Sequence, residues 1–127
     1  MRMKLWWGLG ALGVGLAVYV CLVPTQELPQ AFDLNDKLNH LLGHAVLAVY
    51  FSGLVARRSW WKLFVFLLLL GVAIEIAQHC MHVGRLGDFR DVIANLLGAA
   101  FGLLLGHFGL SRWPQWANRL VGQKASP

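Results

Sequence analysis

The chain is poor in charged residues. Its 127 residues include 11 Lys or Arg and 6 Asp or Glu, so 13% are charged, whereas 57% are hydrophobic. Soluble domains carry about 25% charged and roughly 45–50% apolar residues. This composition excludes an ordinary soluble domain and indicates one small helical membrane domain. The net charge of +5 lies between the apolar stretches and at the chain ends, so membrane lipids are the expected partner and nucleic acid is not.

Reactive side chains are also scarce. The only two cysteines are Cys21 and Cys80, and we expect both near the outer ends of their helices. They either form a disulfide, which needs Cα atoms within about 7 Å and an oxidising compartment, or act as small apolar residues. No arrangement typical of a serine or cysteine nucleophile is present, so an enzyme with this sequence would depend on water-activated hydrolysis, with or without a metal.

Four apolar stretches divide the chain. We predict an all-α, polytopic bundle of four transmembrane helices over about residues 5–23, 36–56, 60–81 and 88–110. They would form a single domain over residues 1–121, followed by a disordered tail over 122–127. The first stretch has 19 residues, or about 28 Å as a helix, which matches a bilayer core. It exceeds the about 7–15 apolar residues of a signal peptide and no cleavage motif follows, so we interpret it as a retained anchor.

The charges alternate from one gap between these helices to the next. Eight of the eleven basic residues fall at the two chain ends and between the second and third helices, and all six carboxylates fall in the other two gaps or at the adjacent helix ends. Lys and Arg are retained on the cytoplasmic side of a membrane. We therefore predict four crossings with both termini in the cytoplasm and the carboxylates toward the outer face.

This topology brings polar residues of three helices to one depth, and helical spacing places them on shared faces. They are Asp36, His40 and His44 on the second helix, Glu75, Gln78 and His82 on the third, and Asp91 and Asn95 on the fourth. The face of Asp91 and Asn95 continues as Gly98, Gly102 and Gly106, which lets another helix approach closely, so this face points into the bundle. A membrane-embedded carboxylate such as Glu75 is costly unless it is paired or hydrated, and should face an interior cavity.

Structural alternatives exist for the charged residues. Glu75 could serve only as an interhelical ion-pair partner of Arg85 or Lys37. Arg85 lies in the glycine-flanked turn Gly84–Gly87. There its guanidinium either holds an anionic group with two hydrogen bonds or forms a salt bridge with Asp88 or Asp91.

The histidines have alternatives as well. His40 is either part of a functional site or a hydrogen-bond partner of Asp91 or Glu75, and Asn95 could form a simple interhelical hydrogen bond. His40 and His44 have the i, i+4 spacing of helical metal ligands. Histidines in a bundle more often satisfy carboxylates, so we predict no metal and no cofactor, and keep these two residues as the weak metal candidates.

Four short motifs lie on this framework: Asp36-Lys37-x-x-His40, Glu75-x-x-Gln78, Gly84-Arg85 and Asp91-x-x-x-Asn95-x-x-Gly98. Their combination over residues 36–102 resembles the VanZ-like family of integral membrane proteins. The resemblance implies a bacterial cytoplasmic membrane protein connected with the cell envelope. It maps the family's characteristic polar residues onto Asp36, Lys37, His40, Glu75, Gln78, Arg85, Asp91 and Asn95.

The resemblance also has limits. The family has no established biochemical activity, and its name-giving member is associated with low-level resistance to the glycopeptide teicoplanin, which does not transfer to this chain by likeness alone. Two positions depart from the family pattern. His44 stands where an aromatic residue is more frequent, which weakens a two-histidine metal site, and Val83 stands where Pro commonly precedes the Gly-Arg pair.

Three functions are compatible with these residues. We favour a binding site for an anionic or glycan-bearing envelope component at the outer leaflet, with Arg85 and Lys37 on the anion and the other polar residues setting its orientation. One alternative is a membrane hydrolase for a lipid-linked envelope precursor, with Glu75 or His40 as general base and Asp91 tuning it. The other is a structural role toward a membrane protein partner, in which the polar residues lock the helices together.

Overall fold

The structure is a computed structural model and describes residues 3–22, 36–81, 89–120 and 122, without the side chains of residues 36, 37, 81 and 89. Within these ranges the chain folds into five α-helices and no β-strand. They are α1 (Met3–Leu22), α2 (Asp36–Ser52), α3 (Trp60–Met81), α4 (Phe89–His107) and α5 (Trp113–Leu120), with 3-10 turns η3 (Arg57–Ser59) and η4 (Leu110–Arg112). The predicted all-α class is confirmed.

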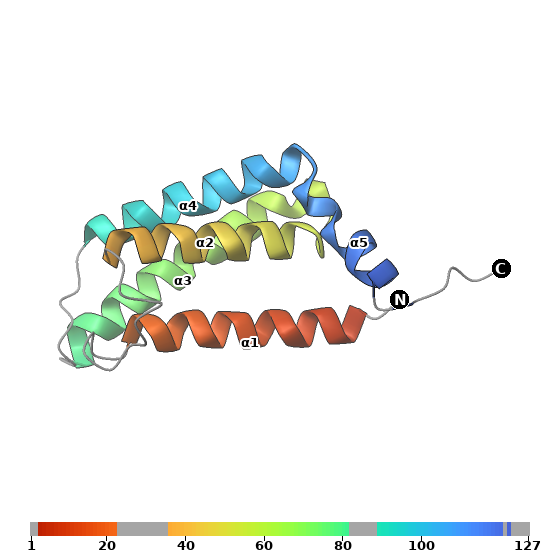
Figure 1. Cartoon of the computed structure of the whole chain (residues 1–127). Helices are drawn as coiled ribbons and strands as arrows, with labels where there is room; N and C mark the ends of the chain where they lie inside the picture. Colours follow the sequence, from red (N-terminus) through yellow and green to blue (C-terminus); the bar gives the residue numbers. More distant parts are fainter. Residues whose placement is uncertain (1–2, 23–35, 82–88, 121, 123–127) are drawn as a thin grey trace.

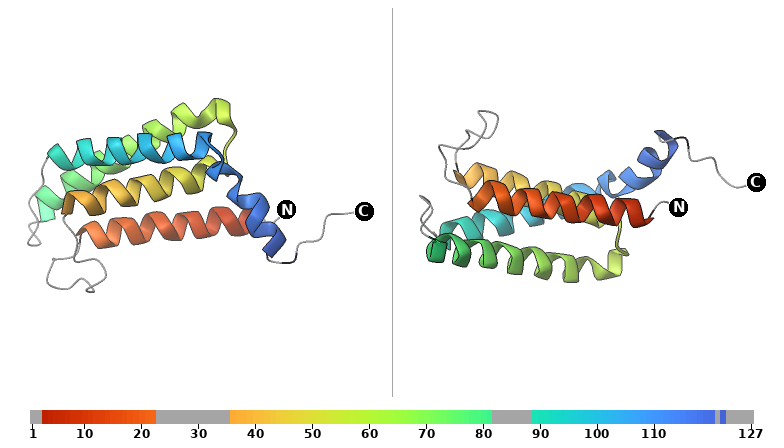
Figure 2. Two further views of the ribbon diagram at one scale, coloured as in Figure 1. Left: turned by 45° about the horizontal axis from the view of Figure 1, so that its top comes forward. Right: turned by 90° about the horizontal axis from the view of Figure 1, so that it is seen from below.

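The four long helices lie side by side, each antiparallel to the next in the sequence (Figure 1). At one end of the bundle α1 and α3 begin, α2 and α4 finish, and α5 turns away from the α4 axis; we call this the α5 end (Figure 2). At the opposite end, the far end, α2 and α4 begin and α1 and α3 finish. The far end therefore receives the first turns of α2 and α4 and the last turns of α3.

The closest helix pair is α2 with α4. A Cβ atom on Gly98 would overlap the carbonyl oxygen of Leu41, and a Cβ atom on Gly102 would overlap that of Ala45. Only glycine permits this backbone approach. One turn further on, a Cβ atom on Gly106 would lie 2.9 Å from Ser52 Oγ. This close approach keeps the beginning of α4 against the beginning of α2, where the buried polar residues of these two helices lie.

Helix α1 packs on the outside of this pair. A Cβ atom on Gly10 would lie 2.8 Å from the Phe51 ring, so α1 is close to α2 near the α5 end. There the Tyr50 hydroxyl donates to the Trp6 carbonyl oxygen at 2.6 Å, and Trp6 Nε1 donates to Asn118 Oδ1 of α5 at 3.0 Å. Most large apolar side chains of α1 are exposed, as expected for a helix that faces lipid.

In the part of the chain that the structure describes, two helical segments are long and apolar enough to cross a membrane, Met3–Leu22 and Arg57–Cys80. A third span results if Arg90–His107 and Leu110–Leu120, which are bent by 74°, count as one. Helix α2 has 17 residues, or about 25 Å, and is polar in its first half. The structure therefore supports a membrane protein with two or three candidate spans, and four crossings stay a prediction.

The observed helix ends differ from those expected. Helix α2 ends at Ser52, earlier than the expected residue 56. At this end the Tyr50 carbonyl oxygen accepts hydrogen bonds from Trp113 Nε1 at 2.8 Å and from the Gly53 N–H at 3.3 Å. Helix α4 ends at His107, before Gly109, whose φ of 130° breaks the helix. Helix α5 is absent from the predicted four-helix layout, which is wrong in this respect. Of the predicted tail, the structure describes only Gly122.

Candidate functional site

Five buried polar side chains lie toward the far end of the bundle, and His40 has contacts with three of them. Their exposed fractions are 2% for His40 of α2, 8% for Glu75 and 1% for Gln78 of α3, and 1% each for Asp91 and Asn95 of α4. We call these five residues the polar cluster. They come together because α3 ends where α2 and α4 begin, so residues far apart in the sequence share one depth in the bundle.

His40 is the centre of the cluster. Its Nδ1 lies 3.0 Å from Asn95 Oδ1, and its Nε2 lies 3.5 Å from Asp91 Oδ2 and 3.8 Å from Glu75 Oε1. An amide oxygen can only accept a hydrogen bond, so Nδ1 carries the proton and donates it to Asn95. In the neutral imidazole, Nε2 then presents its lone pair to two carboxyl groups.

Asn95 can reach His40 because α3 carries glycine opposite it. A Cβ atom on Gly71 would lie only 2.6 Å from Asn95 Nδ2, so a larger residue would displace the amide. Gly71 precedes Glu75 by one helical turn on the same face of α3. The same small-residue contact thus lets α3 approach α4 and keeps the His40–Asn95 hydrogen bond in place.

Gln78 links the cluster to α1. Its Nε2 donates to the Cys21 carbonyl oxygen at 2.6 Å. Among the residues that the structure describes, Gln78 Oε1 and Asn95 Nδ2 are buried without a hydrogen-bond partner. An unsatisfied buried polar atom costs about 1–3 kcal/mol, so both atoms mark positions where the polar group of a bound molecule would be stabilised.

His44 has a different role from His40. It is buried, and its Nε2 donates to the Leu67 carbonyl oxygen at 3.1 Å. This bond ties α2 to the middle of α3. His44 does not belong to the group of possible metal-ligating atoms formed by His40, Glu75 and Asp91, which lie within 4.8 Å of one another.

Several predicted site residues cannot be placed. Arg85 and His82 lie outside the described residues, as do the side chains of Asp36 and Lys37. Cys21 is half-buried and Cys80 is exposed, and the disulfide between them stays untested.

An apolar cavity of about 410 Å³ adjoins the polar cluster. It lies between α1 and α2, and His40 and His44 line it together with apolar residues such as Leu16, Leu47 and Ile74. A Cβ atom on Gly43, which also lines the cavity, would meet no other atom within 4 Å. His40 therefore belongs both to the cavity wall and to the polar cluster. The sequence does not predict this cavity, because the apolar residues that line it follow no distinctive pattern.

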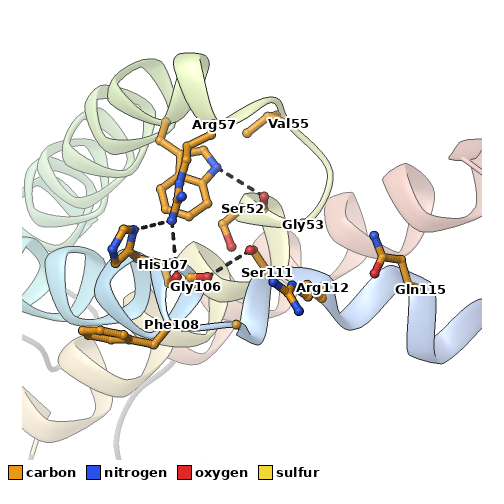
Figure 3. A pocket seen from close by; sticks show the side chains of 12 residues that line it. Ser52, Gly53, Val55, Arg57, Gly106, His107, Phe108, Ser111, Arg112 and Gln115 are labelled. Carbon is orange, nitrogen blue, oxygen red and sulfur yellow. Dashed lines mark hydrogen bonds between the residues drawn. The ribbon is translucent and has the colours of Figure 1, made fainter.

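A second pocket, of about 420 Å³, lies at the α5 end (Figure 3). We call it the basic pocket because Arg57, His107 and Arg112 line it. Arg57 contacts the His107 imidazole and donates to the His107 carbonyl oxygen at 3.3 Å, and Ser111 Oγ donates to the Gly106 carbonyl oxygen at 2.9 Å. From the sequence, these arginines indicate only the inner side of the membrane. The basic residues and glycines at these helix ends are the sequence feature that could have predicted the pocket.

Fold and site together define a small all-α membrane protein that buries a polar cluster among apolar helices. The chain belongs to the VanZ/LLP1 family, whose family model matches residues 11–110. The predicted family is thereby confirmed, and the match includes all five residues of the polar cluster. Comparisons with curated proteins and with solved structures found no significant match.

Proposed function

We propose that this chain is a four-span protein of a bacterial cytoplasmic membrane that binds a lipid-anchored envelope component at the outer leaflet. In this proposal the polar cluster binds the head group and the apolar cavity holds the hydrocarbon chain. The observation that carries it is the double position of His40, which lines the cavity and also contacts the carboxyl groups.

The antiparallel order of the helices supports four crossings. The two segments that meet the criteria for a span, in α1 and α3, both run from the α5 end to the far end. The chain must return across the same thickness between them, and α2 is the segment that does so. Helix α4 returns from the far end in the same way. The short, polar α2 would then cross the membrane packed against the neighbouring helices, so that lipid does not surround it on all sides.

Charge supports the orientation. Arg57, Arg58 and Lys62 lie at the start of α3, and Arg112 and Arg119 lie in or next to α5, all at the α5 end. The described carboxylates lie toward the far end, since Glu75 is near the end of α3 and Asp91 is in the first turn of α4. The positive-inside rule then puts the α5 end in the cytoplasm and the far end outside.

The size and chemistry of the cavity support a lipid as ligand. Ligand pockets typically measure about 300–1,000 Å³ and combine mostly apolar walls with a few polar groups. The cavity at the far end has about 410 Å³, apolar walls from α1 and α2, and two imidazoles. A chain with an anionic or glycan-bearing head group matches this pattern, and Arg85 and Lys37 would supply the cations for an anion.

A cavity-filling variant tests this proposal. Gly43→Leu would place a side chain in the cavity, and we expect at least a tenfold loss of lipid that co-purifies with the protein in mild detergent, measured by mass spectrometry. Gly15→Leu is the matched control, because Gly15 also has open space around its Cβ position but does not line the cavity. Equal lipid content in both variants and the wild type would refute the proposal. Susceptibility to teicoplanin-type glycopeptides is the cellular phenotype to compare in the same strains.

One observation favours a hydrolase as second candidate. Glu75 and Asp91 lie beside the His40 Nε2 atom, and a buried carboxylate next to an imidazole can act as a general base toward water. Release of a head group from lipid-linked precursors by the wild type, abolished in His40→Gln, would favour hydrolysis over binding alone.

The basic pocket supports a second lipid contact on the proposed inner side. Arg57 and Arg112 are exposed at its rim, and Trp60 lies beneath the Arg57 guanidinium at 4.9 Å. Tryptophan and arginine at a helix end are typical of the membrane interface, where they contact anionic head groups.

A further inference from the structure

We infer that His40, Glu75 and Asp91 form a binding site for one divalent transition-metal ion. The inference goes beyond the proposed function, since a metal can bind whether or not a lipid does. It also differs from the sequence-based candidates, because His44 is replaced by two carboxylates from other helices.

The distances fit a metal site. Metal–nitrogen and metal–oxygen bonds of about 2.0–2.2 Å at near-tetrahedral angles place ligand atoms about 3.3–3.6 Å apart. His40 Nε2 lies 3.5 Å from Asp91 Oδ2 and 3.8 Å from Glu75 Oε1. All three ligand atoms lie within 4.8 Å of one another. A single ion among them needs only small side-chain rotations.

The electrostatics of the cluster favour a cation at this point. Two carboxylates that lie close together in a buried site repel each other. Nε2 of His40 faces the same space, and in the neutral imidazole with Nδ1–H on Asn95 this atom carries the lone pair. A divalent ion accepts all three lone pairs and neutralises both carboxylates. Asn95 then has the role of an outer partner that orients the ligating imidazole, as is usual for metal-bound histidines.

The donor set indicates the class of metal. One imidazole nitrogen with two carboxylate oxygens suits borderline ions such as Zn²⁺ better than Mg²⁺ or Ca²⁺, which prefer all-oxygen sites. Three protein ligands leave a fourth position for water or for an oxygen of a ligand. One feature would serve it: Gln78 Oε1 is a buried amide oxygen three residues after Glu75.

Metal analysis of the full chain tests the inference. The protein is purified in detergent with a tag that contains no histidine, without chelators, and its metals are quantified by mass spectrometry. We expect about one transition-metal ion per chain, with a loss of at least tenfold in His40→Gln, Glu75→Gln and Asp91→Asn. These substitutions keep the side-chain size or hydrogen-bonding capacity, which limits misfolding. His44→Gln is the matched control and should keep its metal, because His44 binds the Leu67 carbonyl group instead.

A second measurement keeps the test valid if a variant folds poorly. Wild-type protein stripped of metal is titrated with Zn²⁺, and we expect saturable binding together with a higher melting temperature. Wild type that contains no transition metal and shows no saturable Zn²⁺ binding would overturn the inference, as would equal metal loss in His44→Gln and Glu75→Gln. Gly43→Leu separates the two proposals, since it should lose lipid and retain metal.

Discussion

The two ends of the bundle both concentrate polar side chains, but they do so in opposite environments. At the far end, His40, Glu75 and Asp91 are almost fully buried. At the α5 end, Arg57, His107 and Arg112 are exposed. Leaving a buried polar group without its partner typically costs about 1–3 kcal/mol, whereas an exposed ion pair contributes about 0–1 kcal/mol. The far end is therefore organised around specific contacts, while the polar side chains of the α5 end are open to their surroundings.

The largest expected effect comes from the contact that assembles the far end. Gly98→Leu would force a side chain into the Leu41 carbonyl group and separate α2 from α4. We expect a loss of more than about 4 kcal/mol in the free energy of unfolding, measured by denaturant titration in mixed micelles. Gly8→Leu is the control, because a Cβ atom there has no neighbour within 4 Å. Similar stability of both variants would show that the α2–α4 approach is not what holds the polar cluster together.

The next prediction compares one histidine from each end. His40→Ala removes the Nδ1–H bond to Asn95 Oδ1 and leaves that amide oxygen buried without this donor, which should lower the free energy of unfolding by about 1–3 kcal/mol. His107→Ala removes an exposed partner of Arg57 and should cost less than about 1 kcal/mol. The same micelle titration measures both. If His107→Ala were the more damaging change, the contrast between the ends would be wrong.

The smallest effect on stability is expected in the basic pocket. The double variant Arg57→Gln with Arg112→Gln should change the free energy of unfolding by less than about 1 kcal/mol. Its retention of anionic lipid should fall roughly tenfold or more, because each basic residue near a membrane contributes about 1 kcal/mol. Lipid exchange in nanodiscs at two salt concentrations measures this, with screening reducing the wild-type value. Unchanged retention would remove the lipid contact proposed for the α5 end.

Much of the fold follows from local sequence. The spacing of Asp91, Asn95 and Gly98 puts polar and small residues on one helix face, and the order of apolar stretches makes neighbouring helices antiparallel. The role of His40 as a partner of Asp91 or Glu75 was one of two alternatives that spacing left open, and the structure puts His40 within 3.5 Å of Asp91 Oδ2.

Other features had no sequence signal. His44 binds the carbonyl oxygen of Leu67. Every residue has a backbone carbonyl group, so the residue type does not show which one accepts the hydrogen bond. Helix α5 has 8 residues, which are too few to show a clear hydrophobic period. Its tryptophans indicate a membrane interface, but they do not predict whether the segment there is helical. At the end of α2, Trp113 of a distant segment donates to the Tyr50 carbonyl oxygen, a contact that local propensity cannot anticipate.

The sequence by itself determined the VanZ/LLP1 family, the all-α class and the membrane character, because hydropathy and motif spacing are properties of contiguous residues. Only the tertiary structure decided which polar groups face one another across the bundle, and that His40 rather than His44 joins the two carboxylates. The reason is physical. Helical spacing selects a face, but the depth and rotation of each helix depend on how closely α2, α3 and α4 approach at Gly71, Gly98 and Gly102.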